Sequence, residues 1–203
     1  MRIALIGATG NVGTKILAEA VTRGHQVTGI ARNIGKLTAG DRVTPKQLDM
    51  ADEQRLAEAF KGHDAAVVSV RHNGNDVQHA FRAAKAAGVK RILVVGGAAS
   101  LEAAPGVRLI DTPGFPEAIK VEARPAAEAL DRIREEQELE WSFVSPSIVL
   151  APGQRTGKFR LGGEQVLKDE KGDSRISQED LAVAIIDELE KPRHIRKRFT
   201  VGY

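Results

Sequence analysis

The sequence predicts an α/β protein built on a doubly wound parallel sheet with helices on both faces. Apolar runs alternate with amphipathic segments along all 203 residues, and short turns connect most of them. The first run, residues 3–6, passes through a glycine-containing turn directly into a helical pattern. Repeated βα units of this kind form parallel sheets through right-handed crossovers, and ligands then bind at the carboxyl ends of the strands.

Strands are predicted where short apolar runs are bounded by turn residues. The runs lie at residues 3–6, 26–31, 43–48, 65–70, 89–95, 139–144 and 199–201. The run at 65–70 is apolar throughout, as expected of a strand that is covered on both faces. Pro45 weakens the third strand, because proline cannot donate a ladder hydrogen bond. The last run, 199–201, is predicted to be an edge strand.

Helices are predicted where apolar residues recur at three- and four-residue spacing. They lie at residues 12–20, 52–60, 76–87, 117–135 and 177–191. In the fourth helix, Val121, Leu130 and Ile133 are expected on one face. Ser177 and Asp180 resemble a capping box that opens the fifth helix.

Two segments have the composition of functional loops. Residues 96–116 are rich in glycine and proline, and long ordered loops in compact domains are usually functional. Residues 150–176 are polar and glycine-rich, and we expect them to form a small C-terminal cap over the site, with short strands. No linker divides the chain, so residues 1–203 are predicted to form one domain.

Composition excludes several classes of function. Hydrophobic residues make up 42% of the chain and charged residues 28%, which is typical of a globular domain. The chain has no cysteine, which rules out disulfides and thiolate chemistry. No apolar run approaches the roughly 20 residues that span a bilayer, and the N-terminus reads as a strand instead of a signal peptide. We therefore expect a cytoplasmic protein with no membrane partner.

Charge does not favour a nucleic-acid partner. The formal net charge is +3, and aromatic residues are only 4% of the chain, too few for base-stacking platforms. One basic cluster, residues 193–198, is interpreted as a solvated connection from helix to strand. The expected partner is a small molecule, and the sequence does not specify an oligomeric state.

The glycine turn predicts a pyrophosphate site. Gly7 would allow the tight turn, Gly10 the close approach of a phosphate, and Gly13 the packing of helix on strand. Backbone N–H groups and the helix dipole converge there. We assign the coenzyme contacts of this turn to Gly7, Thr9, Gly10, Asn11 and Val12. The alternatives are a βα turn of another doubly wound protein, or a P-loop, which the order Thr14-Lys15 disfavours.

The second strand indicates which dinucleotide binds. It ends without the carboxylate that accepts the ribose 2′-OH of NAD. Arg32 stands there instead, followed by Lys36, and both suit a 2′-phosphate. We therefore expect NADP, with NADPH preferred over NADH, unless Arg32 is simply a surface arginine. Asp49 is placed either to meet the adenine amino group or to cap a helix.

Further contacts are expected where later strands end. Ser69 and Val70 should line the far side of the coenzyme. Gly96, with Gly97, should leave room for the nicotinamide or a substrate ring. Residues 146–148, at the end of the sixth strand and with Pro146 as the named contact, are expected to contact the nicotinamide carboxamide.

The glycine turn resembles that of the atypical short-chain dehydrogenase/reductases, whose fold is Rossmann-like. Later motifs resemble one branch, the small NAD(P)H-binding proteins labelled NADH-flavin reductases. They are Val94-Val-Gly-Gly-Ala-Ala-Ser100, Asp111-Thr-Pro-Gly-Phe-Pro116, Trp141-Ser-Phe-Val-Ser-Pro146, Pro152-Gly-Gln-Arg-Thr-Gly157, Arg175-Ile-Ser-Gln-Glu-Asp-Leu-Ala182 and Arg198-Phe-Thr-Val-Gly-Tyr203. The resemblance covers essentially the whole chain and implies a bound nicotinamide dinucleotide and a reductase activity.

The chain departs from the wider superfamily in its proton relay. That relay is a tyrosine with a lysine four residues later, but the one tyrosine here is Tyr203, the last residue. The region where the pair is expected offers Lys120 and no phenol. Ser100 could match the catalytic serine of the superfamily, or it could cap a loop. It is the one candidate catalytic residue.

A site without a phenol fits some reductions better than others. Reducing a ketone places charge on an alkoxide that needs a positioned proton donor. A flavin or quinone spreads the charge over its ring, so positioning against the nicotinamide suffices. We therefore expect an oxidoreductase that transfers hydride to a flavin-like or quinone-like acceptor, FMN and FAD included.

Other functions remain as alternatives or are disfavoured. A non-catalytic NADP(H) sensor fits the same absence of a relay, whereas a sugar-nucleotide epimerase is disfavoured by it. No metal is expected, although His72 and His79 lie seven residues apart and could share a helix face. His25, His63 and His194 are expected on the surface or in loops.

Overall fold

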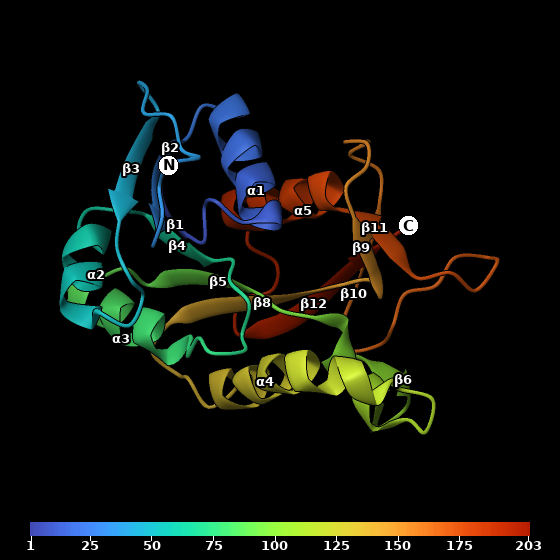
Figure 1. The fold of residues 1–203 in the computed structure, drawn as a ribbon. Helices are drawn as coiled ribbons and strands as arrows, with labels where there is room; N and C mark the ends of the chain where they lie inside the picture. Colours follow the sequence, from blue (N-terminus) through green and yellow to red (C-terminus); the bar gives the residue numbers. More distant parts are fainter.

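The computed structural model describes residues 1–203 and places one eight-stranded sheet between two layers of helices (Figure 1). The strand order is β10-β12-β8-β5-β4-β1-β2-β3, and all neighbours are parallel except β10 and β12. The order reverses between β1 and β4, so the crevice at the carboxyl ends of these two strands is the expected ligand site. The predicted doubly wound α/β fold is confirmed.

The strands of the main sheet follow the predicted runs closely. Their bounds are Arg2–Ile6 (β1), Gln26–Ala31 (β2), Val43–Gln47 (β3), Ala65–Val68 (β4), Arg91–Val95 (β5), Glu140–Pro146 (β8), Arg160–Gly162 (β10) and Lys197–Gly202 (β12). Pro45 is accommodated because β3 is the edge strand at one end of the sheet.

Five helices and two small sheets complete the fold. The helices are Asn11–Thr22 (α1), Glu53–Phe60 (α2), Gln78–Ala87 (α3), Glu117–Ile133 (α4) and Gln178–Glu190 (α5). The small sheets pair Glu102–Ala104 (β6) with Val107–Arg108 (β7), and Val149–Ala151 (β9) with Arg175–Ser177 (β11). None of the helices combines the length and apolar character that a bilayer span requires.

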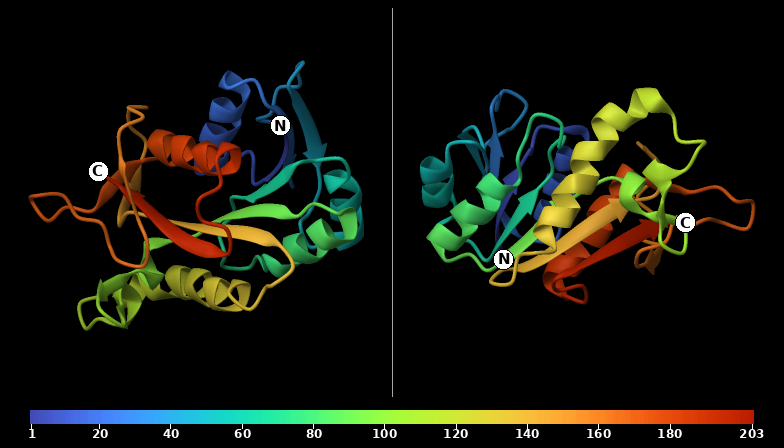
Figure 2. Two further views of the ribbon diagram at one scale, coloured as in Figure 1. Left: turned by 180° about the vertical axis from the view of Figure 1, so that it is seen from behind. Right: turned by 90° about the horizontal axis from the view of Figure 1, so that it is seen from below.

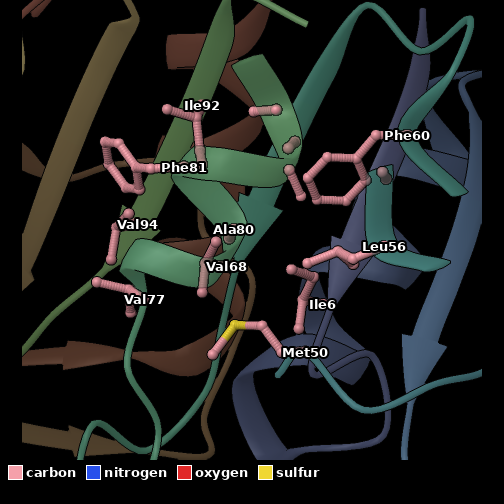
Figure 3. Close-up of a cluster of buried hydrophobic side chains, with 14 of the residues drawn as sticks. Ile6, Met50, Leu56, Phe60, Val68, Val77, Ala80, Phe81, Ile92 and Val94 are labelled. Atoms are coloured by element: carbon pink, nitrogen blue, oxygen red, sulfur yellow. The ribbon is translucent and has the colours of Figure 1, made fainter. Parts of the chain in front are cut away.

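The sheet separates two hydrophobic cores. Helices α1 and α5 pack against each other on one face, and α2, α3 and α4 cover the other (Figure 1). In the second core, Phe60 and Phe81 pack beside Ile6, Val68 and other strand residues (Figure 3). These side chains are fully or almost fully buried. Burial on both faces explains why the central strands are apolar throughout.

Two predictions about individual elements were wrong. The last strand, β12, is not at the edge, because the short antiparallel β10 pairs beyond it. Val121 is 68% exposed, whereas Leu130 and Ile133 are buried, so the three residues do not share one face of α4 as predicted. The N-terminal half of α4 does not pack on the sheet but extends beside residues 98–111 (Figure 2). A periodic pattern therefore predicted the helix correctly but overestimated how much of it is covered.

The basic segment near the C-terminus is also more buried than predicted. Arg198 is only 5% exposed, and its guanidinium contacts Glu164, Ser100 and Ser145. His25 is buried between the N-terminal amine and Glu190, instead of lying on the surface. The alternation of β12 turns Arg198 into the protein, where a carboxylate from the 150–176 segment pairs with it.

Candidate functional site

A cleft of about 880 Å³ opens at the carboxyl ends of the central strands. One side of the cleft is formed by the glycine turn after β1 and by the segments that follow β4 and β5. The opposite side comes from the 109–116 loop, the first half of α4 and the loop around β9. The cleft therefore lies where the reversal of strand order predicts it.

Two of the three glycines of the turn, Gly7 and Gly13, are required by the backbone. Gly7 has φ +81°, and a Cβ there would lie 2.0 Å from the Ser69 carbonyl oxygen. A Cβ at Gly13 would lie 2.0 Å from the Gly7 carbonyl oxygen. At Gly10 a Cβ would meet only that oxygen, at 3.3 Å, so this residue faces open space. Gly7 and Gly13 thus let strand, turn and helix approach closely, while Gly10 leaves the cleft side clear.

The first turn of α1 presents unpaired donors to the cleft. The backbone N–H groups of Asn11, Val12 and Gly13 have no acceptor within the chain, and no side chain caps the helix. Gly10, Asn11 and Val12 line the cleft, whereas Gly7 and Thr9 lie behind them in the turn. Free N–H groups at a helix N-terminus, with no acidic side chain nearby, are suited to an anion such as a pyrophosphate.

The end of β4 borders the cleft. Ser69 and Val70 line the cleft, and the Ser69 N–H donates to the Ile6 carbonyl at 3.0 Å. Gly96 and Gly97 line it as well. The missing side chain of Gly96 makes room for Phe143, whose ring would lie 2.0 Å from a Cβ. The reason predicted for Gly96, space for a ligand ring, is therefore replaced by a packing reason.

The groups assigned to the adenosine end lie beyond the cleft, after β2 and β3. Arg32 and Lys36 are exposed, and neither side chain has a partner in the chain. Asp49 accepts a hydrogen bond from the Ala51 N–H at 2.9 Å, while Asp52 caps α2. Asp49 is thus not the cap of that helix. All three side chains are available to a ligand that extends past the glycine turn.

Two further predicted residues, Pro146 and Ser100, do not line the cleft. Pro146 is buried in β8, and within the predicted stretch 146–148 it is Ile148 that borders the cleft. Ser100 is 5% exposed, and its hydroxyl lies 3.5 Å from Arg198 Nη1. A buried hydroxyl turned toward an arginine is in no position to touch a substrate in the cleft. Ser100 therefore holds Arg198, at the base of the 98–111 segment.

His72 and Gln178 border the cleft and were missed as site residues. His72 is 9% exposed, and its Nε2 donates to the Val95 carbonyl at 2.9 Å. Because a carbonyl only accepts, Nδ1 carries no proton, and it has no partner. Burial lowers the pKa of His72, and the bond to Val95 offsets this only in part. Gln178 follows the helix cap, and its carboxamide has no partner in the chain.

His72 and His79 do not share a ligand. His79 pairs with Glu53 on the surface, at 2.7 Å, whereas His72 is turned toward Val95.

The lone tyrosine is engaged elsewhere. The Tyr203 hydroxyl donates to Asp180 Oδ2 at 2.8 Å and lies 2.9 Å from Ser177 Oγ. Burial would raise the pKa of Asp180, but hydrogen bonds from Thr156, Gly157 and Tyr203 outweigh it and lower the pKa. This network fastens the C-terminus and the 152–157 loop to α5. The expected relay lysine, Lys120, pairs with Glu117 on the same helix.

Three solved structures that match the whole chain share this fold. A protein of Burkholderia pseudomallei is 42% identical, with a TM-score of 0.92 and coverage of 100% of both chains. One from Bacteroides thetaiotaomicron is 39% identical, with a TM-score of 0.93 and coverage of 100% and 96%. One from Streptococcus pneumoniae TIGR4 is 34% identical, with a TM-score of 0.86 and coverage of 100% and 99%. They are named "putative exported protein", "putative epimerase" and "putative NADH-flavin reductase", respectively.

A protein-family model described as NAD(P)H-binding matches residues 7–192, from the first glycine of the turn to the end of α5 and beyond. The matched region includes the free N–H groups of α1, the cleft and the cap segment. The residues present therefore fit a nicotinamide dinucleotide, and the chain belongs to the NAD(P)H-binding family of Rossmann-like oxidoreductases.

Proposed function

We propose that this protein is an NADPH-dependent reductase that passes hydride to a flavin-like or quinone-like acceptor. One observation carries the proposal. A single cleft joins the glycine turn to a chamber with largely apolar walls, and no tyrosine or lysine is among its 24 lining residues. The relay needed for ketone reduction has no place in this cleft.

The residues of the cleft have the properties that hydride transfer to a ring requires. The coenzyme supplies the hydride when it is bound. The free N–H groups of α1 hold the pyrophosphate, and Gln178 offers an amide to the ligand. Phe115, Ile119 and Leu150 give the acceptor side apolar walls. Since solvent can protonate the reduced ring afterwards, no side chain has to donate a proton in the transition state.

The NADPH preference is part of the same proposal. Arg32 and Lys36 are unpaired cations after β2, and no carboxylate stands in their place to accept from a ribose 2′-OH. We also propose a cytoplasmic location. The Burkholderia protein bears the name of an exported one, so fractionation of the native cells is the appropriate check.

Stopped-flow kinetics test the proposed reaction. Oxidation of NADPH by FMN, FAD and simple quinones is followed at 340 nm, with and without enzyme. Acceleration is expected with at least one ring acceptor, and the absence of acceleration with all of them would contradict the proposal. Ala123→Phe fills the chamber and should lower kcat/KM for the acceptor without changing the Kd of NADPH. Ala118→Phe, on the exposed face of α4, is the matched control.

A non-catalytic NADP(H) sensor is the second candidate. The observation in its favour is an exposed apolar surface beside the cleft, where Ile119 and Val121 of α4 are 52% and 68% exposed. A partner protein that covers this surface would respond to the occupancy of the cleft. Tight binding of NADPH and NADP without turnover of any acceptor would favour the sensor.

A further inference from the structure

The acceptor side of the cleft has almost no charge. Its lining residues come from the 98–116 segment, the first half of α4 and the loop around β9. They are Ala98, Ala99, Leu109, Thr112, Gly114, Phe115, Pro116, Ile119, Glu122, Ala123, Ala126, Ile148 and Leu150. None is lysine or arginine, and Glu122 is the single ionisable member. The chamber therefore offers a flat ring good packing and offers an anion no counter-charge.

The charge of Glu122 is not neutralised by a basic side chain. Its carboxylate accepts one hydrogen bond, from Asn73 Nδ2 at 3.2 Å across the cleft. Glu122 is exposed and lines the acceptor side of the cleft, so we expect the tail of a bound ring to pass near it on the way to solvent. An acceptor that carries a phosphate on its tail would bring two like charges together there.

Two residues that line the cleft, Arg71 and His72, have side chains that can carry a positive charge, and both come from the segment after β4. Arg71 follows Val70 at the end of β4, on the wall that adjoins the glycine turn, and it is the one arginine that lines the cleft. His72 has a lowered pKa because of burial and does not supply a charge.

The N-terminus of α4 is also a poor anion site. It reaches the chamber at Pro116, and the N–H groups of Glu117 and Ala118 that follow have no acceptor in the chain. Glu117 places a further carboxylate in the first turn of the helix, where the dipole would otherwise favour an anion. No basic side chain comes from this side of the cleft, and the carboxylate of Glu117 weakens the attraction of the helix end for a phosphate.

We propose that the acceptor chamber selects uncharged planar rings and discriminates against the same ring when it carries a phosphate. This inference rests on the proposed reductase function and specifies its substrate class. The ring takes up two electrons and one proton as hydride while NADPH becomes NADP⁺, and solvent supplies the second proton. Riboflavin should be a better acceptor than FMN, and simple quinones should be accepted as well.

Riboflavin and FMN provide a matched test because they share one isoalloxazine ring. Binding to the NADP⁺-loaded protein is measured by flavin fluorescence, and turnover is measured with NADPH. FMN should bind about tenfold more weakly than riboflavin, as expected for one uncompensated like-charge contact in a partly dry site, and salt should narrow the gap. Glu122→Gln should shift the FMN-to-riboflavin ratio toward one, and Glu122→Lys should shift it further. Glu128→Gln, on the exposed face of α4 away from the cleft, should leave the ratio unchanged.

The two proposals can fail separately. Preferential binding of riboflavin without turnover would refute the reductase function but support the selectivity of the chamber. Equal or tighter binding of FMN would overturn the selectivity, even if both flavins are reduced. Binding of neither flavin would overturn it as well.

Discussion

Replacement of Arg32 by alanine tests how this protein distinguishes NADPH from NADH. Arg32 is exposed after β2, and its guanidinium has no partner in the chain, so a 2′-phosphate would not compete with an internal ion pair. A hydrogen bond to a charged group contributes about 1.5–3 kcal/mol. Because Arg32 is exposed to solvent and Lys36 remains beside it, we expect the lower end of this range. The loss for NADPH is then about 1.5 kcal/mol, or roughly tenfold in Kd.

Titration calorimetry of both coenzymes measures this difference. NADH lacks the 2′-phosphate, so its Kd should change by less than about twofold, within the range of ordinary surface substitutions. Salt should weaken NADPH binding to the native protein more than to the variant, since exposed charges are screened. Arg55→Ala, an exposed arginine on α2 with only a 3.9 Å contact to Asp52, is the control. Equal losses for the two coenzymes would refute the assignment of Arg32.

Three further predictions concern the turn, the buried histidine and the tyrosine. Gly13→Ala should lower both stability and NADPH affinity, because the new Cβ would lie 2.0 Å from the Gly7 carbonyl oxygen. Gly10→Ala should lower NADPH affinity alone. Chemical denaturation measures the stability of the two variants, and calorimetry measures their affinity for NADPH. The pKa of His72 is lowered in the folded protein. Below the ordinary histidine pKa of about 6.5, the unfolded chain therefore binds a proton that the folded protein does not bind. Stability should therefore fall as the pH drops below that value, and urea unfolding at pH 5 and pH 8 should show a smaller difference for His72→Gln; an identical difference would contradict the reasoning. Tyr203→Phe should cost about 1–2 kcal/mol of stability through the lost bond to Asp180, yet leave kcat within about twofold, and a large drop in kcat would reveal a phenol in the chemistry.

The elements that the sequence predicted best are those with a local cause. The glycines of the first turn, the apolar strand at 65–68 and the Ser177 cap owe their form to neighbours within a few residues. The Ser177 hydroxyl accepts from the Asp180 N–H, as the capping pattern predicts. These features appear directly in the order of residue types.

The errors arose where a distant segment decides what a residue touches. Val121 lies nine residues before Leu130, which places it about half a turn away from the buried face of α4, and no residue of α4 before Ala126 is buried. Gly96 lacks a side chain because the ring of Phe143, 47 residues later in the sequence, occupies that space. Arginine is usually a surface residue, but Arg198 is buried because Glu164 and Ser100 accept hydrogen bonds from its guanidinium.

The sequence by itself determined the doubly wound fold and the turn that presents three free N–H groups, because both depend on backbone preferences within one βα unit. Only the tertiary structure decided what surrounds that turn. It turned Ser100 away from the cleft, bound Tyr203 to Asp180, and left Glu122 as the lone charge of the acceptor chamber. Chamber walls are assembled from segments far apart in the chain, so their charge and shape arise from packing that no local pattern encodes.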